Sequence, residues 1–177
     1  MRQSAEPIAP DAAMSYRAAF DAIVAALVPA AQAVYGERLL ALALFGSVAR
    51  GTMRPDSDID LFLVADPLPA GRLARITEFE RVEHGLAGPL AAARGAGVHT
   101  LLSPVIKTPE EMRQGSFLHF DLTDQARILH DPQGVLRGYL DDLAARLQAM
   151  GARRVYRGGG YYWLLKPDYR WGDRIEL

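Results

Sequence analysis

The stretch LFGSVARGTMRPDSDIDLFLV, residues 44–64, joins two apolar runs through a polar segment that opens with Gly46-Ser47. The first run is LLALALF, residues 39–45; the second belongs to the predicted strand DIDLFLV, residues 58–64, whose apolar residues follow two acids. Continuous apolar runs of this length favour strands that are buried on both faces. The sequence therefore predicts two neighbouring core strands, with a short helix and a polar loop between them.

Two acids stand at the start of the second strand. In a strand, side chains at positions i and i+2 point to the same face, so we expect Asp58 and Asp60 to project together and Ile59 to enter the core. Two close carboxylates repel each other, and a hard divalent cation relieves that repulsion. Magnesium prefers a few carboxylates together with phosphate oxygens. The pair predicts a magnesium site.

The residues after the first strand suit a phosphate group. Glycine at Gly46 lets the backbone approach a ligand closely, and the following residues can begin a helix whose free N–H groups face an anion. The Ser47 hydroxyl adds a donor, and the planar guanidinium of Arg50 fits phosphate oxygens. Ser57 has two readings that stay open, a hydrogen bond at the strand entry or a direct role in the site. Phosphate donors beside an acid pair are the parts needed to hold a metal–nucleoside triphosphate.

The same stretch resembles the signature of the minimal nucleotidyltransferases, in the DNA polymerase beta superfamily. That signature is a hydrophobic residue, Gly-Ser, about ten residues, and then Asp-hydrophobic-Asp. Here residues 48–57 separate Ser47 from Asp58. The resemblance implies a small mixed sheet flanked by helices, an α/β (α+β) fold with the polymerase-beta-like nucleotidyltransferase architecture. It also implies two magnesium ions, ATP or another nucleoside triphosphate as substrate, and transfer of a nucleoside monophosphate, AMP in the first instance, to a protein or nucleic-acid hydroxyl.

The family also implies a third carboxylate on a later strand, and here the sequence departs from it. The next predicted strand, VHTLLSPVI at residues 98–106, contains no Asp or Glu. Asp121 and His99 are the candidate substitutes for a catalytic role. The alternatives are a helix N-cap for Asp121 and a satisfied strand histidine for His99. A second function hypothesis follows: a non-catalytic nucleotide- or partner-binding module that keeps the acid pair without the third acid.

The rest of the chain divides into three parts. Residues 1–13 predict a flexible tail, residues 14–150 the nucleotidyltransferase domain, and residues 151–177 an aromatic and basic extension. Within the domain, helices are expected over 14–34, 72–93 and 133–149, with a short one from Thr108 and a small strand at 127–131. The extension holds six of the 15 aromatic residues of the chain. We expect it to pack on the domain or on a partner chain, including a second copy of itself, because Tyr and Trp favour interfaces. RNA binding by stacking and charge is the weaker reading.

Composition limits the remaining classes. Half of the residues are hydrophobic, the net charge is -1 and there is no cysteine. These values are typical of a globular domain with no disulfide and no Cys-ligated zinc, and they do not favour long-range attraction to nucleic acid. No run approaches ~20 continuous apolar residues, so we expect no membrane span. We expect a cytoplasmic location. Because minimal nucleotidyltransferases often pair with HEPN-domain proteins, the resemblance implies a HEPN-type partner in a toxin–antitoxin pair, or an RNA acceptor.

Overall fold

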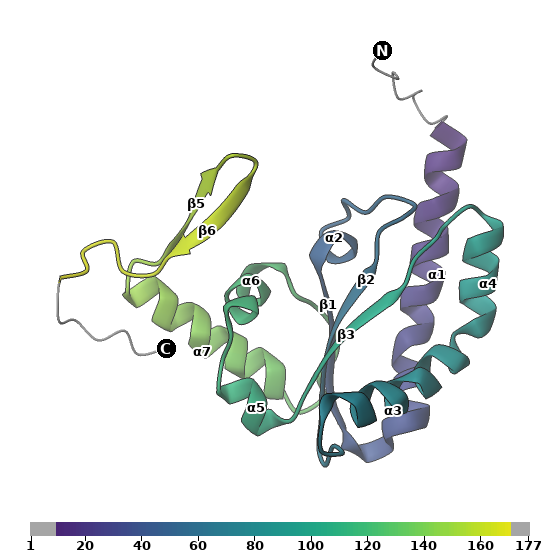
Figure 1. Ribbon diagram of the computed structural model, residues 1–177, viewed down its shortest axis with the longest axis horizontal. Coiled ribbons are helices and arrows are strands. Elements are labelled where there is room, and N and C mark those ends of the chain that lie inside the picture. The colour runs from purple at the N-terminus through teal and green to yellow at the C-terminus, as the bar shows by residue number, and fades with distance from the viewer. Residues whose placement is uncertain (1–9, 171–177) are drawn as a thin grey trace.

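The computed structural model describes the chain from residue 10 to residue 170 (Figure 1). The helices are α1 (Pro10–Tyr35), the 3₁₀ turn η1 (Gly36–Arg38), α2 (Gly46–Ala49), α3 (Arg72–Gly85), α4 (Ala87–Gly95), α5 (Pro109–Arg113), α6 (Phe117–Gln125) and α7 (Val135–Ala149). The strands are β1 (Leu39–Phe45), β2 (Ile59–Ala65), β3 (Leu102–Lys107), β4 (Arg127–His130), β5 (Arg153–Arg157) and β6 (Gly160–Leu164).

The first four strands form one mixed sheet in the order β3-β2-β1-β4. β1 pairs antiparallel with β2 and with β4, while β2 and β3 run parallel. β3 lies at the edge of this sheet, which is where a strand interrupted by Pro104 is tolerated. The predicted small mixed sheet flanked by helices is confirmed.

Each face of the sheet packs against a different group of helices. One face carries Leu42, Leu44, Leu61 and Leu63, which pack with the apolar sides of α1, α3 and α4. The other face carries Ala41, Ala43, Phe62 and Val64, which pack with residues of α5, α6 and α7. Alternation along β1 and β2 thus divides an unbroken apolar run between two cores. Figure 1 shows this arrangement, with α1, α3 and α4 on the side opposite α6 and α7.

The local signals for α5 and α6 differ in clarity. Thr108 accepts from the backbone N–H of Glu111 at 3.2 Å, and the Glu111 carboxylate accepts from the Thr108 N–H at 3.1 Å. This reciprocal capping box, with Pro109 as the first helical residue, gives the short helix expected from Thr108. α6 has Ser116 as its N-cap residue and no side-chain cap.

Three expectations about element limits are wrong. α1 begins at Pro10, so residues 10–13 are helical rather than tail, while residues 1–9 lie outside the described part. The single helix expected over 72–93 is two helices, because the chain leaves helical geometry at Leu86 between α3 and α4. The strand expected over 98–106 begins only at Leu102. Periodicity locates an element better than its ends, where tertiary contacts decide.

The expectation that no segment can span a membrane also needs correction. Residues Tyr16–Arg38 reach a mean hydropathy of 1.6 and are long and apolar enough to cross a bilayer by length and composition alone. That test is also passed by the core helices of soluble proteins. In this chain Phe20, Ile23 and Leu27 of α1 are fully buried against the sheet and its neighbouring helices.

The C-terminal extension contains a β-hairpin. β5 and β6 form a separate two-stranded sheet, with Arg154 opposite Trp163 and Tyr156 opposite Tyr161. Trp163 packs with Phe120 of α6 and with Leu143 and Leu147 of α7. This part of the extension packs on the domain through Trp163. Trp171 lies outside the described residues.

Candidate nucleotide-binding site

Gly46 lies in direct contact with one of the two predicted metal ligands. The β1–β2 register pairs Phe45 with Asp60, so the residue that follows Phe45 lies against the Asp60 side chain. Gly46 has φ +68°, and a Cβ on it would overlap Asp60 Oδ2 and lie 3.0 Å from Asp60 Cγ. The backbone conformation and the close approach both require glycine here. From the sequence we expected the Gly46 backbone to approach a ligand closely. In the structure it closely approaches the Asp60 carboxylate.

Asp58 and Asp60 lie near one another at the start of β2, as predicted. Asp60 is half-buried, and Asp58, just before the strand, is exposed and accepts a hydrogen bond from the Leu101 N–H at 3.3 Å. Burial raises the pKa of Asp60, the neighbouring charge of Asp58 raises it further, and Arg50 lowers it. The pair therefore holds negative charge that nearby protein cations do not fully balance, a condition that a bound divalent cation would relieve. The donor set fits one such ion.

The polar residues after β1 form a single helical turn, as expected. Ser47 lies in α2, its carbonyl accepts from the Thr52 N–H at 2.9 Å, and its hydroxyl has no hydrogen-bond partner within residues 10–170. Arg50 follows the turn and donates to Gln125 Oε1 of α6 at 2.8 Å. Because the amide partner is neutral, the charge of Arg50 stays available to a phosphate. Sequence reasoning missed Gln125, since nothing local links it to a residue 75 positions earlier.

The candidate substitutes for a third acid do not join the pair. His99 precedes β3, is exposed, and its backbone N–H donates to Pro55 O at 2.8 Å, so the strand position expected for it is wrong. Asp121 is neither an N-cap nor free: it lies inside α6 and accepts from Trp163 Nε1 at 3.0 Å and Arg154 Nη2 at 3.3 Å. Ser57 accepts from the Arg54 N–H at 2.8 Å, a contact within the loop that leads into β2.

The sheet register identifies the residue beside Asp60 on the later strand. In the parallel pair of β2 and β3, Asp60 lies opposite Ser103, so the two side chains share a face. Ser103 is exposed and carries a hydroxyl, on the later strand for which the family resemblance implies a carboxylate. Within residues 10–170 no cluster of three or more His, Asp or Glu side chains is placed to hold a metal ion.

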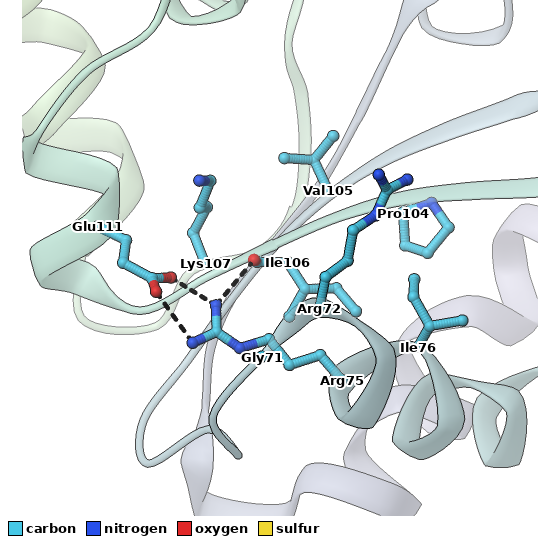
Figure 2. Close-up of a pocket in the computed structure, with 9 residues that line it drawn as sticks. All are labelled: Gly71, Arg72, Arg75, Ile76, Pro104, Val105, Ile106, Lys107 and Glu111. Carbon is cyan, nitrogen blue, oxygen red and sulfur yellow. Dashed lines mark hydrogen bonds and ion pairs between the residues drawn. The ribbon is translucent and has the colours of Figure 1, made fainter.

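A hollow of about 340 Å³ lies on the other side of the edge strand and is separate from these residues. Figure 2 shows Arg75 of α3 crossing it to the carboxylate of Glu111, with Arg72 and Lys107 pointing away on either side of Val105. None of its lining residues belongs to the acid pair or the Gly46–Arg50 turn. The residues that the sequence predicted for the site therefore lie at the opposite end of β2, where Gly46 contacts Asp60.

A mixed sheet that presents a Gly-Ser turn, an arginine and an acid pair at one end has the parts of a transferase that acts on nucleoside triphosphates. The comparison with protein families gives the same class: residues 35–92 match the nucleotidyltransferase domain. That segment runs from the end of α1 into α4 and contains Gly46, Arg50 and both acids. This segment of the chain is therefore similar to the nucleotidyltransferase domain, in agreement with the resemblance.

Solved structures show more distant likenesses. A toxin–antitoxin structure with AMP-PNP contains a chain that is 20% identical, with 73% of this chain and 90% of that chain covered and a TM-score of 0.42. A chain of the toxin–antitoxin MntA-HepT structure is 16% identical, with 72% and 88% covered and a TM-score of 0.42. A search of curated proteins found no match. Likenesses this distant assign neither an activity nor a partner to this chain.

Proposed function

We propose that this protein binds a magnesium–nucleoside triphosphate, in the first instance Mg–ATP, and transfers the nucleoside monophosphate to a hydroxyl of a protein or nucleic acid. The observation that carries the proposal is the contact between the Gly46 backbone and the Asp60 carboxylate. This contact places the Gly46–Arg50 turn directly beside the acid pair, so one ligand can reach both. In this assignment Asp58 and Asp60 hold the cation, and Gly46, Ser47 and Arg50 hold the phosphates.

Each group has a defined task in that reaction. Arg50 and the Ser47 hydroxyl orient and neutralise the phosphates, and positioning of this kind supplies much of the catalysis in phosphoryl transfer. A cation held by the acid pair contributes charge neutralisation on the phosphate oxygens. The acceptor hydroxyl must still lose a proton, and its pKa lies far above neutrality. Ser103 is a weak base at that place, so we expect slow transfer by this chain alone.

The second candidate function is a non-catalytic nucleotide- or partner-binding module, and two observations favour it. Ser103 occupies the position beside Asp60, and Asp121 is held by Arg154 and Trp163 of the hairpin. Within either function we propose a cytoplasmic protein with a HEPN-type partner in a toxin–antitoxin pair, or an RNA acceptor. That proposal rests on the resemblance of the Gly46–Asp60 segment to the minimal nucleotidyltransferases.

Calorimetry with magnesium and a non-hydrolysable ATP analogue tests the binding site. We expect the wild type to bind the analogue, EDTA to abolish that binding, and Asp60→Asn to abolish it because one of two cation ligands is lost. Asp56→Asn is the control, since it removes an acid from the same loop without touching the pair. Equal binding with and without the cation would overturn the assignment.

A transfer assay with labelled ATP separates enzyme from module. Wild type, Asp121→Asn and His99→Ala are compared, with candidate partner proteins and RNA supplied. We expect slow transfer that His99→Ala leaves unchanged and that Asp121→Asn does not abolish, because neither residue joins the acid pair. Tight Mg–ATP binding with no transfer under any condition would instead favour the module.

A further inference from the structure

The β5–β6 hairpin has two chemically different faces. Cross-strand partners share a face, as do residues two apart on one strand, so Arg154, Tyr156, Tyr161 and Trp163 all project together. In Figure 1 the hairpin extends from the end of α7, with its turn at the same end of the view as α2. Arg154 and Trp163 of this face contact Asp121 of α6, so the aromatic and cationic face is the one that meets the body of the domain.

The base of that face is anchored on α6. Arg154 forms ion pairs with Asp121 at 3.3 Å and with Asp124 at 2.7 Å. Trp163 donates to the same Asp121 carboxylate, and its ring lies 5.9 Å from that of Phe120 in an edge contact. These contacts between two elements hold the hairpin in one orientation. The next pair on this face toward the turn, Tyr156 and Tyr161, is therefore held in the same orientation.

Those next residues are two tyrosines. The rings of Tyr156 and Tyr161 lie 5.6 Å apart and are tilted by 55°, and the Arg154 guanidinium lies 5.1 Å from the Tyr161 ring. Tyr161 is nevertheless 41% exposed and Tyr156 74% exposed. An aromatic ring that is held in place but still exposed is a preformed stacking surface, because little side-chain entropy is left to lose on binding.

α6 connects this surface to the acid pair. Gln125 lies four residues after Asp121, a rise of about 6 Å along the same side of α6. Gln125 holds Arg50 at 2.8 Å, and Asp121 holds the hairpin. A hollow of about 480 Å³ opens between α6 and β6 and is lined by Phe117, Asp121 and Tyr161, among others. Through Gln125 and Asp121, α6 therefore contacts both Arg50 and the hairpin that lines the hollow.

We propose that Tyr161, held by the Arg154–Asp121 pair and extended by Tyr156, stacks on the base of the nucleoside triphosphate whose phosphates lie at Gly46–Arg50. This inference rests on the proposed function and adds a base-binding residue to it. It assigns the C-terminal hairpin to the substrate site and predicts a preference for purines, whose larger rings overlap more of a tyrosine. Burial raises the pKa of the Tyr161 phenol, Asp121 raises it further, and the charges of Arg154 and Arg50 lower it, so Arg50 acts on this residue electrostatically.

The test compares two ligands that share phosphates but not a base. Calorimetry measures the binding of a non-hydrolysable ATP analogue and of inorganic tripolyphosphate, each with magnesium, to the full chain. We expect Tyr161→Ala to weaken analogue binding about tenfold, within the range of stacking on one aromatic ring, and to leave tripolyphosphate binding unchanged. Tyr161→Trp should restore analogue binding. Tyr169→Ala is the matched control, because it removes an exposed tyrosine of the same extension away from the hairpin face.

The outcomes are separable. Unchanged analogue affinity in Tyr161→Ala, with tripolyphosphate still bound, would overturn the stacking role and leave the proposed function standing. Failure of the wild type to bind either ligand would overturn the proposed function itself. Where Tyr161→Ala lowers the melting temperature, Tyr161→Leu fills the same space without an aromatic ring and should weaken analogue binding equally. A labelled single-stranded oligonucleotide is titrated in parallel: loss of its binding alone would place the base contact on an acceptor strand and overturn the assignment.

Discussion

At the scale of single residues, glycine at position 46 is required twice. Its φ of +68° lies in the left-handed region, and any Cβ would overlap the Asp60 carboxylate. Gly51, five residues later, has the nearly identical φ of +69°, yet a Cβ on it would meet no other atom within 4 Å. Replacing Gly51 by alanine therefore carries only the conformational cost, whereas replacing Gly46 carries the conformational and the steric cost.

We predict that Gly46→Ala and Gly51→Ala each cost about 1 to 2 kcal/mol of stability from the backbone conformation. Only Gly46→Ala should also abolish Mg–ATP binding, because the new methyl group displaces the Asp60 carboxylate. Thermal unfolding and calorimetry measure the two effects on the same samples. If both variants bind Mg–ATP like the wild type, the contact between Gly46 and Asp60 has no role in the site.

His119 is a buried polar residue that the site does not use. It is 1% exposed, its Nδ1 lies 2.7 Å from the Tyr139 hydroxyl, and its ring contacts the edge of Phe62. Burial is the first cause that lowers the pKa of His119, to about 4, with the charge of Lys107 second. The native state therefore keeps this imidazole neutral, and protonation favours unfolding.

We predict that stability falls as the pH decreases from about 6.5, where His119 titrates in the unfolded chain, toward about 4. Linkage gives a loss of about 2 kcal/mol between pH 7.5 and pH 5. His119→Gln cannot titrate and should have a flatter profile over that interval. Urea unfolding at several pH values measures it, and equal slopes for the two proteins would show that another group is responsible.

At the scale of elements, an ion pair joins α3 to α5 across the edge strand. Arg75 contacts both Glu111 oxygens, at 2.6 Å and 2.9 Å, and donates to Ile106 O at 3.5 Å (Figure 2). Its Nε also donates to Pro69 O at 2.9 Å. Glu111 is also the capping-box residue of α5. One guanidinium thus ties together the turn before α3, the end of β3 and the start of α5.

We predict that Arg75→Lys destabilises the fold by about 1 kcal/mol, after allowance for partial exposure, because an ammonium cannot reproduce the bidentate contact. Arg81→Ala, which removes an exposed arginine from the same helix, is the control and should be neutral. Urea unfolding measures both. Equal stability of Arg75→Lys and wild type would mean that the planar geometry does not matter here.

At the scale of the whole molecule, the C-terminal hairpin is attached chiefly through Trp163. Its ring packs with Phe120, Leu143 and Leu147, and its Nε1 donates to Asp121. Its neighbour Tyr162 lies on the opposite face of the hairpin and is 52% exposed. Comparing substitutions of Trp163 and Tyr162 therefore separates the loss of hairpin attachment from the loss of an aromatic side chain.

We predict that Trp163→Ala lowers stability by about 2 to 3 kcal/mol, somewhat below the cost of truncating a fully buried tryptophan, and that Tyr162→Ala changes it little. Thermal unfolding measures the difference, and limited proteolysis reports whether the hairpin is released. Size exclusion of the same variants tests the expected homo-oligomer. An intact hairpin in Trp163→Ala would show that the Arg154 ion pairs suffice.

Local sequence determined the parts of this protein that depend on neighbours in the chain. The apolar runs at 39–45 and 58–64, the Gly46-Ser47 turn, the shared face of Asp58 and Asp60 and the Thr108 capping box all follow from spacing and backbone geometry. Each is decided by residues a few positions apart, so their periodicity and caps are visible without a fold.

Only the tertiary structure decided which distant residues join that turn. The register between β2 and β3 places Ser103 beside Asp60. Asp121 accepts hydrogen bonds from Arg154 and Trp163 of the hairpin. Gln125 reaches Arg50 because α6 covers the same face of the sheet. Strand register and helix docking are set by hydrogen bonding and packing between segments far apart in the chain, and no local pattern carries that information.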